Sequence, residues 1–233
     1  MTSIKSKLPQ TTPLQPVIGI FGGTFDPIHI GHVHCALQVL QQCPLEQVRL
    51  MPCHLPPHRV TPGVSAQQRA EMVQLAIAEH PQLILETLEL EQHRPSYSAI
   101  SLQQLQQRYP KHKLAFIMGM DAFNQFTSWH RWQDILHCAD LIVCQRPEHS
   151  QLSSDSKALL TQHQMFDVQQ LQQQQTGRIL LLDNPLQDMS ATSLRQQLAH
   201  SQTPPKGLDT AVWNYIQQHQ LYKGSHPAAA IKK

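Results

Sequence analysis

The chain has 233 residues, of which 40% are apolar and 15% charged, and its formal net charge at pH 7 is +2. This length allows one α/β domain with a core that needs no disulfide support. A net charge this close to zero gives no support for a nucleic-acid partner, and no run approaches the roughly 20 apolar residues that a membrane span requires.

The cysteines and the chain ends indicate where the protein works. The five cysteines are odd in number, scattered, and form no C-x-x-C pair, which is typical of reduced thiols in a cytosolic protein. The amino-terminal segment MTSIKSKLPQTTPLQP lacks the long apolar stretch of a signal peptide. We therefore expect a cytoplasmic protein with flexible tails at residues 1–16 and 223–233.

Strand and helix signals alternate along the chain. In order, the sequence predicts a strand at 17–21, a helix at 31–42, a strand at 47–52, a helix capped by Ser65 at 65–80, a strand starting at 83, a helix at 98–108, strands at 113–119 and 140–147, a strand within 177–185, and helices within 188–200 and 210–222. The glutamine-rich run VQQLQQQQTG, at 168–177, indicates a surface helix or loop insert. This alternation predicts a single-domain α/β protein with a Rossmann-like, doubly wound and mainly parallel sheet.

The passage FGGTFDPIHIGHVH, at 21–34, lies where the first predicted strand gives way to the first helix. Ligands of such sheets bind beyond the carboxyl ends of the strands, where free backbone N–H groups and the helix dipole attract phosphate. Gly22 and Gly23 would let a phosphate approach the backbone closely. The passage is neither a Walker A loop, which needs GK[ST], nor a dinucleotide fingerprint, which needs GxGxxG.

Two histidines in this passage are candidates for phosphate binding. His29 and His32 lie one helical turn apart, so both imidazoles can face the same side and donate to one phosphate. Gly31 between them removes a side chain that would crowd a nucleotide. A metal site that also uses His34 is an alternative, although no HExxH motif or carboxylate partner lies nearby. A second alternative is that these histidines lie on the surface and have no function.

GGTFDPIHIGH resembles the signature of the HxGH nucleotidyltransferase superfamily, whose members transfer a nucleoside monophosphate from an NTP and release pyrophosphate. Further stretches along the chain are LPPHR (55–59), RPSYSA (94–99), FIMGMDAFNQFTSW (116–129), LIVCQRP (141–147) and MSATSLR (189–195). Their order and spacing are similar to those of the bacterial nicotinate-nucleotide adenylyltransferase family. The resemblance covers residues 18–222 and implies a nucleotidyltransferase domain at 17–222.

The resemblance implies adenylyl transfer from ATP to nicotinate mononucleotide, which gives deamido-NAD and pyrophosphate. The sequence shows no obvious general base, and the acceptor phosphate needs none, because its second pKa of about 6 leaves it mostly dianionic. Catalysis would then rest on positioning and on neutralising charge. The implied cofactor is Mg²⁺, bound mainly through the ATP phosphates. The expected partners are these small molecules, and the oligomeric state is left open.

On the ATP side, the resemblance implies that the two histidines bind the α-phosphate and that MSATSLR binds the β and γ phosphates. The alternative interpretation of MSATSLR alone is an ordinary helix cap. The catalytic residues expected are His29, His32 and Arg195. The ATP-binding residues expected are Gly22, Gly23, Thr24, Phe25, His29, Gly31, His32, Gly119, Asp121, Ser190, Thr192 and Arg195, with the helix of MSATSLR starting at Ser193.

On the acceptor side, the resemblance implies that Trp129 stacks on the pyridine ring and that Tyr97 and Ser98 meet the carboxylate. Neutral donors there would discriminate against an amide. The acceptor-binding residues expected are Cys53, His58, Arg59, Tyr97, Ser98, Trp129 and Arg146. Two positions depart from the family pattern, since Ser98 replaces a threonine and Cys53-His54 replaces a small polar residue.

Two other classes of protein compete with this interpretation. One is an adenylyltransferase for another phosphorylated acceptor, such as phosphopantetheine, whose arm has no ring to stack on Trp129. The other is a non-catalytic protein that binds a nucleotide or a metal. Such a module need not keep His29, His32 and Arg195 together, so these residues argue against it.

Overall fold

The computed structural model describes residues 14–55, 64–92, 95–145, 151–183 and 189–223. Most of both predicted tails lies outside these ranges, so the tails and the domain limits 17 and 222 stay predictions. All five cysteines are present as thiols, and four of them are buried.

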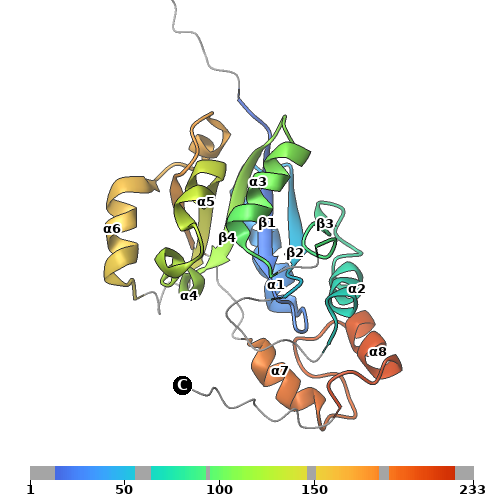
Figure 1. Ribbon diagram of the computed structural model, residues 1–233. Coiled ribbons are helices and arrows are strands. Elements are labelled where there is room, and N and C mark those ends of the chain that lie inside the picture. The colour runs from blue at the N-terminus through green and yellow to red at the C-terminus, as the bar shows by residue number, and fades with distance from the viewer. Residues whose placement is uncertain (1–13, 56–63, 93–94, 146–150, 184–188, 224–233) are drawn as a thin grey trace, which may run out of the picture.

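One parallel sheet organises the chain (Figure 1). Its seven strands lie in the order β3-β2-β1-β4-β5-β7-β6. They are β1 Val17–Gly23, β2 Gln47–Pro52, β3 Leu83–Leu85, β4 Lys113–Gly119, β5 Ala139–Gln145, β6 Gln164–Met165 and β7 Ile179–Asp183. Every pairing between these described strands is parallel. The chain builds outward from β1 to β3 and then returns to β4, so the strand order reverses between β1 and β4, where α/β sheets bind their ligands.

Helices cover both faces of the sheet, which confirms the predicted doubly wound fold. They are α1 Ile30–Gln42, α2 Ala66–Ala76, α3 Ser98–Arg108, α4 Met120–Phe123, α5 Trp132–Cys138, α6 Ser154–His163, α7 Ala191–Leu198 and α8 Thr210–Gln218, with 3-10 turns η1 Phe126–Ser128 and η2 Val168–Gln172. None of the described helices is both long and apolar enough to cross a membrane.

Strand β1 shows how the two faces are built. Val17 and Phe21 belong to one buried cluster, which α1, α2 and α8 complete. Ile18 and Ile20 belong to a second cluster, completed by α3, α5 and α6. Successive side chains of a strand point to opposite faces, so a continuous apolar run is what a strand buried on both sides needs. Helices α7 and α8 lie below the sheet, at the carboxyl ends of its strands (Figure 1).

The glutamine-rich stretch is not a simple surface insert. Its turn η2 buries Leu171 completely. The ammonium of Lys113, at the start of β4, donates to the Leu171 carbonyl oxygen at 3.0 Å and to the Asp140 carboxylate. Arg178 donates to the same carboxylate through its backbone N–H at 2.9 Å. Asp140 is fully buried, so this charge cluster ties η2 to the amino ends of three strands.

Helix α8 ends in a Schellman motif with an unusual residue. The Leu221 N–H donates to the Ile216 oxygen at 3.0 Å, and the Gln220 N–H donates to the Gln217 oxygen at 3.2 Å. Gln220 has a φ of 53°, in the left-handed region where glycine is usual.

We expect Gln220→Gly to raise the free energy of unfolding by about 1 kcal/mol, because the left-handed conformation costs a residue with a Cβ roughly that much. Urea unfolding measures the change. Gln217→Gly, inside α8, serves as the control and should lower stability by about 0.5 kcal/mol. A loss of stability in both variants would contradict the argument.

Candidate functional site

The turn between β1 and α1 is built around the ring of Phe25. This residue has a φ of 48° and is buried. A Cβ on Gly23 would lie 2.8 Å from the Phe25 ring, so the ring can occupy its place only because position 23 is glycine. The ring packs edge-on against His32, with centroids 5.1 Å apart, and against Phe21 at 5.7 Å.

His29 and His32 stack on each other at the start of α1. Their ring centroids are 3.7 Å apart and their planes differ by 25°. His29 is the residue that caps the helix, and its backbone N–H donates to His32 Nδ1 at 3.3 Å. A Cβ on Gly31 would lie 3.0 Å from His29 Nδ1. Gly31 therefore leaves space for the His29 ring. The sequence alone predicts that this space serves a bound nucleotide.

Both imidazoles are held neutral. Burial lowers the pKa of His29 to about 4, and burial together with the neighbouring His29 lowers the pKa of His32 well below its ordinary value. Because His32 Nδ1 accepts a hydrogen bond, the neutral ring carries its proton on Nε2, which is a donor. His29 Nδ1 is buried and has no hydrogen-bond partner within the described chain.

We expect the protein to lose stability as the pH falls from 6.5 to 4. Between these pH values His29 binds a proton in the unfolded chain, where its pKa is about 6.5. It stays unprotonated in the native protein, where its pKa is about 4, so acid favours the unfolded state. The loss from this residue should reach ~3 kcal/mol at 1.36 kcal/mol per pKa unit. Urea unfolding of wild type and His29→Gln at several pH values measures it. The variant should show a shallower dependence, and parallel curves would contradict the pKa.

The metal-binding alternative gains no support from this geometry. Within the described ranges, no group of three or more histidine, cysteine, aspartate or glutamate side chains is arranged to hold a metal ion. His34 lies on α1, half-buried, and takes no part in the stack of His29 and His32.

Helix α7 brings Arg195 to the same turn. Arg195 Nη1 donates to the Asp26 carbonyl oxygen at 2.7 Å, and Nη2 donates to Thr192 Oγ1 at 3.2 Å. The helix starts at Ala191, two residues earlier than the sequence predicts, because Ser190 is its cap and Ser190 Oγ accepts from the Ser193 N–H at 3.1 Å.

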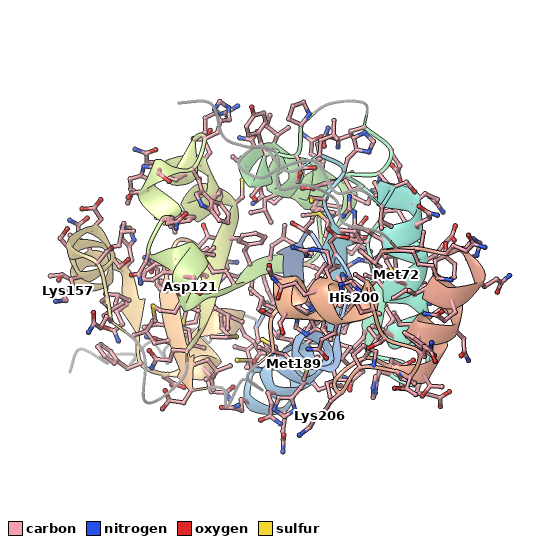
Figure 2. The ribbon with its side chains drawn as sticks, turned by 90° about the horizontal axis from the view of Figure 1, so that it is seen from below. Met72, Asp121, Lys157, Met189, His200 and Lys206 are labelled. Atoms are coloured by element: carbon pink, nitrogen blue, oxygen red, sulfur yellow. The ribbon has the colours of Figure 1, made fainter. Side chains whose placement is uncertain are left out.

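The segment after α7 is fastened to the start of α1. The Ile30 N–H donates to the Gly207 carbonyl oxygen at 3.0 Å. Gly207 has a φ of 92°, and a Cβ there would lie 1.9 Å from the sulfur of Met189. Figure 2, seen from below, shows Met189 and, further along, His200 on the chain that forms α7 beneath the sheet. The α7 region therefore lies against the turn between β1 and α1 that carries the two histidines, here called the histidine turn.

The end of β4 provides another part of the site. Gly119 has open space where a Cβ would be, and it caps the short helix α4. Asp121 is exposed in the first turn of α4, directly after the carboxyl end of β4, and Figure 2 labels it in the view from below. Strands β1 and β4 are neighbours. Their carboxyl ends, at Gly23 and Gly119, therefore both lie where the strand order reverses.

The predicted acceptor residues lie along α3 and η1. Tyr97 caps α3, Ser98 is its first residue, and both are half-buried. Trp129 follows η1 and packs against Phe116 of β4, with ring centroids 6.3 Å apart. Tyr97 contacts the ring of His130 at 4.6 Å.

Cys53 follows β2, and burial raises the pKa of its thiol, which therefore stays protonated. Three further predicted acceptor residues, His58, Arg59 and Arg146, lie outside the described residues.

Arg69 is a structural residue of the site that sequence reasoning missed. It comes from α2 and is fully buried. Its guanidinium donates to the carbonyl oxygens of Thr24 (2.5 Å), Cys53 (2.6 Å) and His54 (3.1 Å). It thus joins the loop after β1 to the loop after β2. Its spacing of three residues from the buried Met72 was a signal that this charge faces inward.

Comparison with known proteins agrees with this architecture. The chain matches the cytidylyltransferase-like family over residues 20–197. It is 42% identical to the "Probable nicotinate-nucleotide adenylyltransferase" of Shewanella pealeana, over 89% of this chain and 96% of that protein. It is 43% identical to the protein of the same name from Cellvibrio japonicus, over 90% of this chain and 100% of that protein.

A solved structure shares the fold. It is the Plasmodium falciparum nicotinic acid mononucleotide adenylyltransferase complexed with NaAD, with a TM-score of 0.69 and 17% identity over 89% of this chain and 97% of that one. Since the sequence matches extend over almost the full length of bacterial relatives at more than 40% identity, this chain belongs to the nicotinate-nucleotide adenylyltransferase family of cytidylyltransferase-like enzymes.

Proposed function

We propose that this protein transfers the adenylyl group of ATP to nicotinate mononucleotide. A phosphate oxygen of the mononucleotide attacks the α-phosphorus of ATP, the bond from that phosphorus to the bridging β-oxygen breaks, and deamido-NAD and pyrophosphate form. The observation that carries the proposal is the stacked pair of neutral histidines at the helix start beside the strand-order reversal.

In this proposal His29 and His32 bind the α-phosphate. The Nε2 donor of His32 would meet a non-bridging oxygen, where negative charge increases as the new bond forms. A donor that is fixed in place before the reaction needs no reorganisation in the transition state. The stack, the edge contact with Phe25 and the space left by Gly31 hold both rings in place.

Arg195 and the first turn of α7 would bind the β and γ phosphates. The first N–H groups of a helix have no partner within the helix and attract anions. Arg195 is held by Thr192 and by the Asp26 carbonyl oxygen, so its charge lies near the histidine turn. Ser190 would contribute chiefly by capping α7, and Gly22, Gly23, Gly119 and Asp121 would border the nucleotide.

We assign Mg²⁺ to the ATP phosphates, where it would neutralise charge on the leaving pyrophosphate. The neutral imidazoles and the guanidinium beside the turn between β1 and α1 suit the phosphates, which would in turn supply most of the oxygen ligands of the ion. Mg²⁺ usually keeps several waters and takes few protein ligands when it binds with a nucleotide.

The acceptor would bind between Trp129 and the start of α3. Trp129 offers a half-buried aromatic ring, and the start of α3 offers the N–H groups and hydroxyl of Tyr97 and Ser98 for a carboxylate. His58, Arg59 and Arg146 would meet the mononucleotide phosphate, and the neutral Cys53 thiol would lie beside it. The cytoplasm stays the predicted location.

The test is pyrophosphate release from purified protein with ATP and Mg²⁺, using nicotinate mononucleotide, nicotinamide mononucleotide or phosphopantetheine as the acceptor. We expect strong release with the nicotinate form only. Release only with phosphopantetheine would support the role of the histidines in adenylyl transfer. It would contradict the acceptor-binding roles of Trp129, Tyr97 and Ser98. No release with any acceptor would overturn the proposal.

A further inference from the structure

Tyr222, near the carboxyl end of the described chain, reaches back to the histidine turn. Its hydroxyl donates to Asp26 Oδ1 at 2.7 Å across 196 residues of sequence. The Schellman motif that ends α8 directs the chain here, and Tyr222 itself has a φ of 60°. A non-glycine residue in this conformation is strained, so the surrounding structure holds it in place.

Asp26 connects Tyr222 to Arg195. Its carbonyl oxygen accepts from Arg195 Nη1 at 2.7 Å, whereas its carboxylate oxygen Oδ2 lies 3.8 Å from the same nitrogen. A tight pair of guanidinium and carboxylate has N···O distances of about 2.7–2.9 Å. The guanidinium is therefore oriented by the Asp26 backbone, while the Asp26 charge is kept at a distance.

The tyrosine hydroxyl is a permanent donor. Burial and the adjacent Asp26 raise the pKa of Tyr222 far above its ordinary value. Oδ1 is thus occupied at every working pH, and the carboxylate is restrained from turning toward Arg195.

We propose that Tyr222 is a positioning residue that restrains the Asp26 carboxylate and so keeps the charge of Arg195 available to the triphosphate of ATP. This inference rests on the proposed role of Arg195. Without the hydroxyl, Asp26 would form a close ion pair with Arg195 and neutralise the charge that the leaving pyrophosphate needs.

The test is a double-mutant cycle with Tyr222→Phe and Asp26→Asn. Tyr222→Phe should lower kcat for pyrophosphate release about tenfold, since a hydrogen bond to a charged group is worth roughly that factor or more. In the Asp26→Asn background the same change should alter kcat less than about twofold, because no carboxylate remains to approach Arg195. Asp26→Asn alone should change kcat less than about twofold, since the backbone oxygen that holds Arg195 remains, so the double variant should be more active than Tyr222→Phe alone. Equal losses in both backgrounds would indicate a merely structural role and overturn the inference.

Tyr215→Phe is the matched control. Tyr215 also donates to a carboxylate, that of Glu71, but this bond joins α8 to α2 and involves neither Asp26 nor Arg195, so kcat should stay unchanged.

Binding of inorganic tripolyphosphate, measured by calorimetry on the same variants, separates the inference from the proposed function. Tyr222→Phe should weaken it about tenfold only when Asp26 is present. This pattern would support the inference even if the wild type used another acceptor, and an unchanged affinity would overturn it.

Discussion

Replacing His32 with alanine should lower kcat for pyrophosphate release by about 10²–10³-fold, the effect of removing one donor from a charge-stabilising site. KM for ATP and for nicotinate mononucleotide should change much less, because the lost interaction strengthens in the transition state. Steady-state kinetics with varied concentrations of each substrate measures both quantities. The stacked, neutral ring of His32 is the reason to expect so specific a loss.

His34→Ala is the control for this prediction. The residue lies on the same helix, two positions further along, and does not belong to the stack with His29. Its variant should keep the wild-type kcat within about twofold, the range of a change that removes no bond to the reacting phosphate. Full activity of His32→Ala would show that the mechanism is wrong.

Replacing Asp140 with asparagine should lower the free energy of unfolding by about 3–5 kcal/mol, because one partner of a buried ion pair is removed. The side chain keeps its shape and one acceptor oxygen, but Lys113 and Arg178 lose the buried carboxylate that faces both of them. For a chain of this size the melting temperature should fall by about 10 °C. Calorimetry measures the change.

The same substitution at Asp134 is the control. Asp134 pairs with Arg131 at the surface, where the two side chains are 29% and 47% exposed, and such pairs are worth less than about 1 kcal/mol. Equal shifts for Asp140→Asn and Asp134→Asn would contradict the claim that burial makes the difference. Activity of Asp140→Asn at low temperature should remain, since this cluster lies at the amino ends of the strands, away from the histidine turn.

The predictable parts of the fold were those with local signals. The helix predicted at 98–108 has those bounds in the structure, and Ser65 caps α2 as its sequence indicates, with Gln68 completing the cap. Helix α5 was missed because it follows Arg131, a residue with a left-handed backbone and no capping side chain. Leu171 was missed because one buried leucine is hidden among glutamines that carry no apolar period.

In the candidate site, too, the features with local sequence signals were predictable and the long-range contacts were not. The spacing of His29 and His32 predicts that both can face one side of α1, and their rings do stack there. The contacts of Arg69 and Tyr222 join residues 45 and 196 positions apart. The spacing of Arg69 from Met72 indicates that this charge faces inward, but no local pattern names the partners of Arg69 or of Tyr222, which only the folded chain reveals.

The position of Arg69 has a consequence for how the length of this chain can vary. One guanidinium is fastened to backbone oxygens in two separate loops, and backbone oxygens are present whatever the side chains are. Side-chain replacements at Thr24, Cys53 or His54 can therefore leave these bonds intact. An inserted or deleted residue in either loop would instead shift a carbonyl away from the guanidinium. We expect these two loops to tolerate changes of composition far better than changes of length.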